Sequence, residues 1–128
     1  MSGLSSQEIA ALERDLGCVL PADVRAKYSE ADGLLGPTNC SFLYPYRMPA
    51  NTQVVQINVL ARADDWVPDS LAEIVILGDD GCGNYLCLSP SEGSAILWNP
   101  ADGDWVQERV PSMTALWAHV ERFYASVA

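Results

Sequence analysis

The side chains best suited to catalysis are few in this chain, and their placement argues against an active site. His119 is the only histidine, so any Ser/His/Asp or Cys/His arrangement would have to use it. It lies in a segment with helical spacing, on the side away from the apolar residues, where we expect it to face solvent. Adjacent acids such as Asp79 and Asp80 could perform acid–base chemistry, but acids in turns are usually solvated. We therefore expect that the protein is not an enzyme.

Metal and phosphate sites are also poorly represented. The cysteines show no CxxC spacing, so a zinc site would need an irregular ligand set, and the acidic turns lack the ligand spacing of a calcium loop. The glycine-rich run GDDGCGN at 78–84 does not match the phosphate-binding pattern GxxxxGK[ST], and its aspartates would repel a phosphate. We expect no metal, no cofactor, and four reduced thiols that are mostly buried.

Charge is the clearest feature of the composition. The chain has 17 acids against 7 bases and a net charge of −10. A field of that sign repels nucleic acid and anionic lipid and speeds encounter with a cationic partner. Ordinary solubility of an acidic protein accounts for the same composition. The charge therefore predicts no binding to nucleic acid or membrane, and a basic partner if there is one.

Aspartates and tryptophans in predicted loops are the candidates for binding such a partner. Trp98 and Trp117 lie in apolar patterns typical of core packing, whereas Trp66 and Trp105 lie beside polar loops. Loop aromatics also fold back over the edge of a core, so both interpretations stay open for these two. The candidate partner-binding residues are Asp64, Asp65, Trp66, Asp69, Asp79, Asp80, Asp102, Asp104 and Trp105.

A predicted β-hairpin is the central element of the chain. Residues 74–77 and 85–88 are apolar runs of strand-forming side chains, short for helices and separated by turn residues. The residues expected to shape the turn are Gly78, Gly81, Gly83 and Asn84, which tolerate positive φ. The pattern predicts a buried hairpin whose polar tip faces water.

The N-terminal region predicts a pair of helices. Ser5 and Glu8 have the spacing of a capping box, apolar residues then recur at helical intervals, and Gly17 ends the first helix. A second helix is expected to begin with Pro21 near its first position and to end with Gly33 in the left-handed conformation.

The second half of the chain predicts a meander closed by a helix. Residues 95–98 form an apolar run, the dipeptide Asp102-Gly103 is a strong hairpin signal, and residues 105–108 should return antiparallel. Residues 112–127 carry apolar side chains at intervals of three and four, which suits a helix that covers a sheet.

Residues 34–63 give weaker signals. Only residues 42–44 resemble a strand, and in residues 52–63 helical spacing competes with β-branched side chains; we predict a helix there. The order of elements predicts one α+β domain over residues 1–128, with a mainly antiparallel, twisted sheet of about four to six strands. The helical pair precedes the sheet, and the last helix packs against it.

Four short motifs, taken in order, resemble the SUKH superfamily, which comprises fungal cell-wall assembly regulators and many bacterial toxin-immunity proteins. The matching residues are Leu16, Gly17, Leu20, Pro21, Asp32, Gly33, Gly78, Asp79, Asp80, Gly81, Gly83, Asn84, Trp98 and Ser112. The likeness spans residues 8–124. Two positions depart from the common pattern: Asn84 stands where many members have aspartate, and Met113 follows Ser112 where many have phenylalanine.

The resemblance implies a binding module without a shared catalytic centre. In bacteria it implies an immunity protein of a polymorphic toxin or contact-dependent competition system, which covers the active site of a cognate toxin, often a nuclease, or a surface beside it. A nuclease site is typically cationic, so an acidic surface would complement it. The alternative is a regulatory scaffold domain that recruits host proteins; a small hydrolase using His119 is a third hypothesis. With no export signal or membrane-spanning run, we expect a cytoplasmic protein, either a monomer or a weak homodimer.

Overall fold

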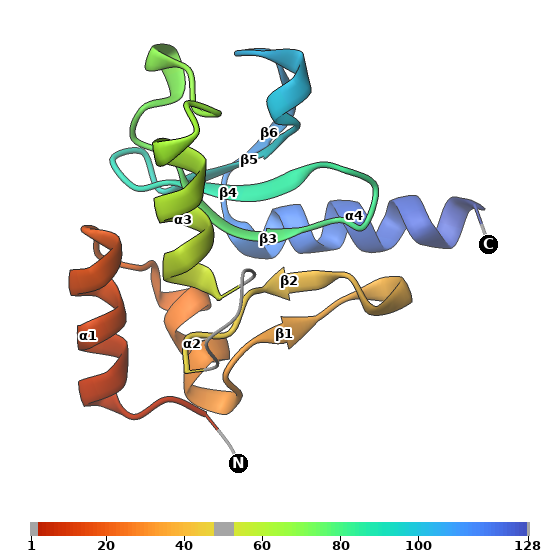
Figure 1. Ribbon diagram of the computed structural model, residues 1–128. Coiled ribbons are helices and arrows are strands. Elements are labelled where there is room, and N and C mark those ends of the chain that lie inside the picture. The colour runs from red at the N-terminus through yellow and green to blue at the C-terminus, as the bar shows by residue number, and fades with distance from the viewer. Residues whose placement is uncertain (1–2, 48–52, 128) are drawn as a thin grey trace.

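The computed structural model describes residues 3–47 and 53–127. Its main elements are α1 (Ser6–Leu16), α2 (Ala22–Glu30), β1 (Leu34–Leu35), β2 (Ser41–Leu43), α3 (Val54–Ala63), β3 (Val75–Asp79), β4 (Tyr85–Ser89), β5 (Ser94–Trp98), β6 (Val106–Val110) and α4 (Met113–Val127). Single 3-10 turns η1 (Pro37–Asn39), η2 (Asp69–Leu71) and η3 (Pro100–Asp102) lie between them. The predicted α+β fold is confirmed (Figure 1).

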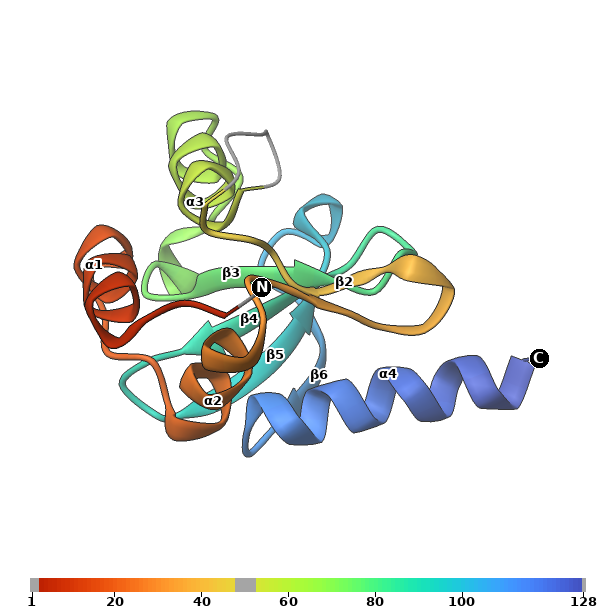
Figure 2. The same ribbon diagram turned by 90° about the horizontal axis from the view of Figure 1, so that it is seen from below.

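The strands form two antiparallel sheets rather than one. β1 pairs with β2, and β3 to β6 form a four-stranded meander in chain order. α3 lies on one face of the meander, and α4 lies on the other face beside α2 (Figure 2). The core fills both interfaces; its largest fully buried side chains include Trp98, Tyr28, Leu12, Leu20, Leu43, Ile76, Leu86 and Leu116. The helices therefore sandwich the hairpin that the sequence placed at the centre.

The ambiguous segment before residue 64 is helical in its described part. Val54, Ile57 and Ala61 are buried on one side of α3, and α3 contacts β3. Burial of this apolar stripe outweighs the local preference of β-branched residues for strand, because most helical stability in proteins comes from tertiary packing. The prediction of a helix is confirmed for residues 54–63; Thr52 lies outside the described residues.

The predicted limits of the second helix need correction at both ends. Pro21 is the N-cap residue rather than the first helical residue, and the helix ends at Glu30 with Ala31 extended at φ −157°. Gly33 has φ 113° but is not the left-handed residue that ends the helix. A Cβ atom there would lie 3.3 Å from the carbonyl oxygen of Leu43. The glycine is therefore explained by the turn into β1 and its approach to β2.

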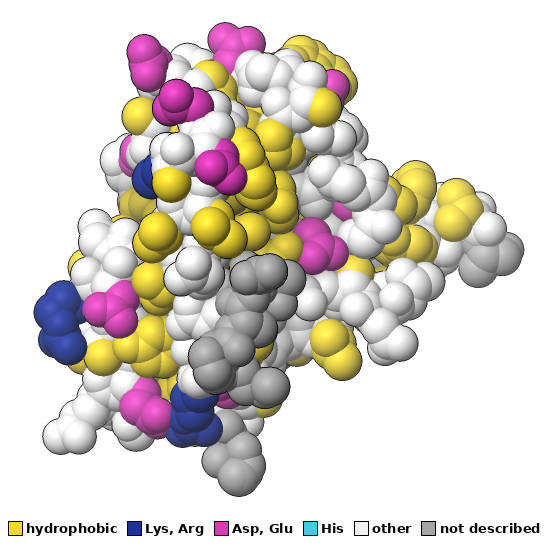
Figure 3. Space-filling view, in the orientation of Figure 1, with side chains coloured by type: hydrophobic (Ala, Val, Ile, Leu, Met, Phe, Trp, Pro, Cys, Tyr) yellow, Lys and Arg dark blue, Asp and Glu magenta, His cyan; other side chains and the backbone are white. Residues whose placement is uncertain are grey.

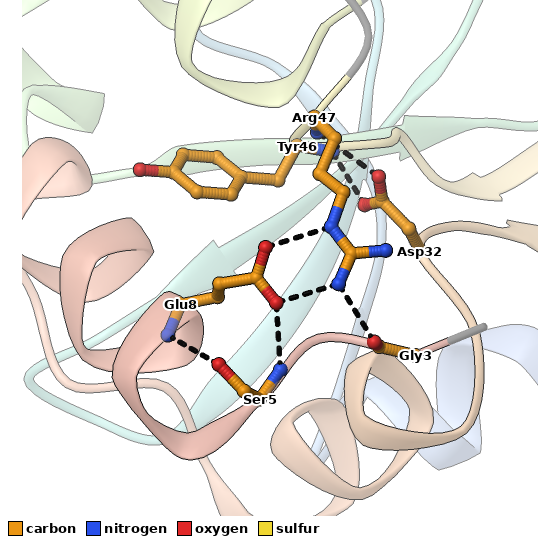
Figure 4. A network of polar contacts seen from close by, with 6 residues as sticks. All are labelled: Gly3, Ser5, Glu8, Asp32, Tyr46 and Arg47. Carbon is orange, nitrogen blue, oxygen red and sulfur yellow. Dashed lines mark hydrogen bonds and ion pairs between the residues drawn. The ribbon is translucent and has the colours of Figure 1, made fainter. Parts of the chain in front are cut away.

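Hydrogen bonds from Arg47 connect the segment after β2 to the start of α1 (Figure 4). Its Nε donates to Glu8 Oε2 at 2.7 Å, and its Nη2 donates to the carbonyl oxygen of Gly3 at 2.9 Å. Glu8 also completes the predicted capping box with Ser5. Hydrogen bonding from Arg47 and from the Ser5 N–H lowers the pKa of Glu8 to about 2. The same segment is held by Asp32, which accepts the N–H of Arg47 at 2.9 Å.

Candidate functional site

Three of the predicted binding residues, Asp64, Asp65 and Trp66, lie at the C-terminal end of α3. The Trp66 N–H donates to the carbonyl oxygen of Ala61 at 2.9 Å, and the Asp65 N–H donates to that of Arg62 at 3.3 Å. These two bonds form a Schellman ending, in which Asp65 takes the left-handed conformation at φ 58°. The chain reverses there, and Trp66 turns back toward the sheet.

Asp64 and Asp65 occupy positions that oppose the stability of the helix. Carboxylates at a helix C-terminus face the negative end of the helix dipole. A left-handed non-glycine residue adds backbone strain. α1 ends with the same pair of bonds, but there Gly17 takes the left-handed position at φ 76°. Residues that break a local rule in this way are typical of functional positions.

The turn between β5 and β6 lies at the same end of the sheet as the loop after α3. The Trp98 indole donates to the carbonyl oxygen of Gly103 at 2.7 Å and holds the turn against the strand. Ser70 Oγ, in the loop after α3, donates to Asp104 Oδ2 at 3.4 Å. Both segments lie at the top of Figure 1. The structure thus brings together two loops that are separated by a hairpin and a strand in the sequence.

We call this surface the acidic end and define it by Asp64, Asp65, Asp69, Asp102 and Asp104. All five are exposed, and within the described residues none forms an ion pair. Acidic side chains gather over the C-terminal end of α3 and the loop beyond it at the upper left of Figure 3. Trp105 adjoins the turn and is 60% exposed. The acidic end therefore offers unpaired negative charge beside an accessible aromatic ring.

Trp66 behaves differently from Trp105. Its ring stacks on Tyr85 with centroids 6.3 Å apart and an interplanar angle of 16°, and both side chains are half-buried. Tyr85 pairs across the strands with Asp79. Sequence reasoning assigned Tyr85 only to an apolar strand and missed this contact. No local signal could have shown it, because the residues meet only after the loop folds over the sheet.

Asp79 and Asp80 lie away from the acidic end, at the tip of the β3–β4 hairpin. Asp80 is only 7% exposed; its carboxylate accepts the N–H of Cys82 at 2.8 Å and that of Asn84 at 3.2 Å. Asn84 Nδ2 donates to the same carboxylate at 2.8 Å. The expectation that the whole tip faces water is therefore wrong for Asp80 and Asn84, because Asp80 supplies the acceptors that the tight turn lacks.

The other residues of the tip divide by role. Asp79 is half-buried and accepts the Tyr44 hydroxyl at 2.6 Å. Gly81 and Gly83 have φ 77° and 93°, as the predicted turn required. Gly78 has a different reason to be glycine, since a Cβ atom there would lie 2.3 Å from the carbonyl oxygen of Ser41 in β2. The tip is thus a packed turn with an exposed glycine-rich edge.

His119 is half-buried rather than solvent-facing, which corrects the prediction for its position. It lines a cavity of about 120 Å³ between α4 and the hairpin tip. The lining residues are Asp80, Cys82, Asn84, Leu97, Gln107, His119, Val120 and Phe123. Among the described residues, no cluster of three or more His, Cys, Asp or Glu side chains could hold a metal ion. His119 also has no hydrogen-bond partner in that part of the chain.

The fold and the surface features indicate the general class of the protein. The molecule is a small α+β domain whose most distinctive surface is acidic and partly aromatic. A family model matches residues 3–126, and the chain belongs to the SMI1 / KNR4 family (SUKH-1). That family includes toxin-immunity proteins and is generally regulatory rather than enzymatic. A comparison with curated proteins gave no match. Within residues 3–47 and 53–127, no helix has the length and apolar character needed to cross a membrane.

Proposed function

We propose that the protein is a non-enzymatic immunity protein that binds and neutralises a basic protein toxin. Its acidic end would approach the cationic site of the toxin, for which a nuclease active site is the expected chemistry. Membership in a family that includes toxin-immunity proteins supports this assignment. We place the protein in the cytoplasm, where the described free thiols Cys18, Cys40, Cys82 and Cys87 would remain reduced.

The observation that carries the proposal is the placement of Asp64 and Asp65 at the end of α3. Helix stability alone would favour a basic residue and a glycine there. The chain instead has two exposed carboxylates that no described cation neutralises. Selection for a partner explains this choice better than selection for solubility, because any exposed position can supply solubility.

In this proposal the toxin is neutralised in two steps: opposite charges bring the two proteins together, and the bound protein then blocks the toxin's active site. Complementary charge steers the encounter, so the toxin arrives with the acidic end facing its cationic site. Exposed Trp105 can then be desolvated at the contact, where aromatic side chains contribute strongly to binding. A bound protein domain over the site would prevent the nucleic-acid substrate from entering. The proposal requires no covalent step and no cofactor.

The first test is affinity capture with the intact protein from the cells that express it, followed by mass spectrometry. We expect one small basic protein whose gene adjoins that of this chain. The purified pair should then show loss of the partner's toxic activity on addition of the protein. Recovery of several unrelated proteins, or of none, would contradict the immunity function and favour the regulatory scaffold domain.

The second test locates the interface. Asp64→Asn combined with Asp65→Asn removes two charges from the acidic end, and Glu30→Gln combined with Glu121→Gln removes two exposed charges from α2 and α4. We expect the first pair to weaken binding and neutralisation and the second pair to leave both unchanged. Equal effects of the two pairs would show that net charge, rather than this surface, drives binding.

A further inference from the structure

We propose that the stacked rings of Trp66 and Tyr85 form a receptor for one arginine side chain of the partner. This inference rests on the proposed function, because it names the chemistry that the partner brings to the surface beside the acidic end. Four observations support this inference: the geometry of the stack, its polar atoms without hydrogen bonds, the negative charge near it, and the engagement of Arg62 elsewhere.

The two rings are held by independent backbone interactions. Trp66 is fixed by its N–H bond to Ala61 at the end of α3, and Tyr85 is fixed in β4 between Asp79 and Trp98 of the neighbouring strands. The stack therefore exists before a partner arrives. A preformed aromatic pair loses little conformational entropy on binding. Both rings are half-buried and pack against the core, so a cation can approach only the part of the pair that remains exposed.

Each ring also has a polar atom without a protein partner. Within the described residues, neither the Trp66 indole N–H nor the Tyr85 hydroxyl forms a hydrogen bond, and neither is among the fully buried unsatisfied atoms. Both atoms are therefore available to a ligand. The hydroxyl can accept a hydrogen bond from a guanidinium group, and the indole can donate to a backbone carbonyl of the partner.

The surrounding charge is negative. Asp79 pairs across the strands with Tyr85, and burial, together with the negative charge of Asp79, raises the pKa of the tyrosine. Asp64 and Asp65 immediately precede Trp66. Figure 3 shows a strip of hydrophobic side chains beside α3, with acidic side chains near both of its ends.

No described cation of the chain fills this position. Arg62, the base nearest to Trp66 in sequence, donates through Nη2 to the carbonyl oxygens of Ala72 at 3.0 Å and Ile74 at 2.6 Å. It is thus engaged at the edge of β3, and the ring contact of Trp66 is with Tyr85. An aromatic pair that lies beside Asp79 and directly follows Asp64 and Asp65 in the chain is complementary to a cation from outside.

Arginine fits this site better than lysine. The guanidinium group is planar, stacks on aromatic faces and is more weakly hydrated than an ammonium group. Its several N–H donors can bond to more than one acceptor at the same time. A cation–π contact at a partly exposed site strengthens binding by about two- to fivefold. A single arginine should therefore bind weakly alone, and the contact should gain strength within a larger interface.

The experiment uses the intact protein and a small probe. N-acetyl-arginine methylamide is titrated into ¹⁵N-labelled protein while the indole N–H signals are followed by NMR, with the Trp66 signal assigned from its loss in Trp66→Leu. N-acetyl-citrulline methylamide is the matched neutral probe, and the lysine analogue is the matched ammonium probe. We expect the Trp66 signal to shift progressively as the concentration of the arginine probe rises, and at equal concentration to shift much less with the other two probes. Trp105→Leu should leave this response unchanged.

Tyr85→Phe is the second variant, since it keeps the ring and removes only the hydroxyl. We expect the shift of the Trp66 signal per unit of arginine-probe concentration to be about two- to fivefold smaller, as loss of one hydrogen bond implies. An unmoved Trp66 signal, or equal shifts from arginine and citrulline, would overturn the proposal. Equal shifts from arginine and lysine would overturn the assignment to guanidinium. Because the probe contains no toxin, these results are independent of whether the acidic end binds one.

Discussion

The side-chain amide of Asn58 bonds both backbone polar groups of Ile76. Its Nδ2 donates to the carbonyl oxygen, and its Oδ1 accepts the N–H, each at 2.8 Å. A neighbouring strand would make the same pair of bonds. β3 is an edge strand of the four-stranded sheet, so Asn58 closes part of that edge from α3. The bonds fix α3, and with it Asp64 and Asp65, relative to the sheet.

We expect Asn58→Ala to destabilise the protein by about 2 kcal/mol, because it leaves the N–H and carbonyl of a buried strand residue without partners. The measurement is the free energy of unfolding from denaturant titration. Gln56→Ala, on the exposed side of the same helix, is the control and should change stability by less than about 0.5 kcal/mol. Similar values for both variants would show that the edge bonds contribute nothing.

Replacing Asp65 by glycine should stabilise the fold and weaken binding at the same time. Asp65→Gly relieves the left-handed strain and removes a carboxylate from the helix C-terminus, which we expect to raise the free energy of unfolding by about 0.5–1 kcal/mol. Gly17→Asp is the reverse change at the matching position of α1, where a Cβ atom would meet no heavy atom within 4 Å. It should lower stability through backbone strain and through the new carboxylate at the helix C-terminus, without a steric clash. Thermal melting of each variant measures these changes. Melting temperatures equal to that of the wild type for both variants would refute the strain argument.

The Glu8–Arg47 pair should make stability depend on acidity. The pKa of Glu8 falls from 4.5 to about 2 in the folded protein, so the folded state favours the charged carboxylate. The stabilisation is therefore present above pH 4.5 and is lost as the pH falls toward 2. We expect Glu8→Gln to melt below the wild type at pH 7, with a difference that shrinks progressively below pH 4.5. Glu121→Gln, at an exposed position on α4, should show no such convergence.

Association with the basic partner should weaken as salt rises, because mobile ions screen exposed charges. For the combined change Asp64→Asn and Asp65→Asn, we expect about a three- to tenfold lower association rate at low salt and a flatter salt dependence. Stopped-flow kinetics measures both quantities. Charge reversal at Asp80 is not a suitable test, since Asp80 is buried and holds the hairpin turn. A rate independent of salt would remove the steering argument.

The sequence by itself determined the elements that depend on neighbouring residues. The capping box of Ser5 and Glu8 and the ending at Gly17 use bonds within a few positions, so their residue types suffice to predict them. The hairpin strands and α4 follow from apolar runs and helical spacing in the same way. The order of these local motifs also predicted the family, which the match over residues 3–126 confirmed.

Tertiary structure decided the features that join distant segments. α3 is helical because its stripe packs on β3, and the stack of Trp66 on Tyr85 depends on how the loop after α3 returns to the sheet. Asp80 resembled an exposed loop acid in the sequence, but the turn draws it inward. Strand register, burial and hydrogen bonds between distant residues set these outcomes, and local propensity contains none of that information.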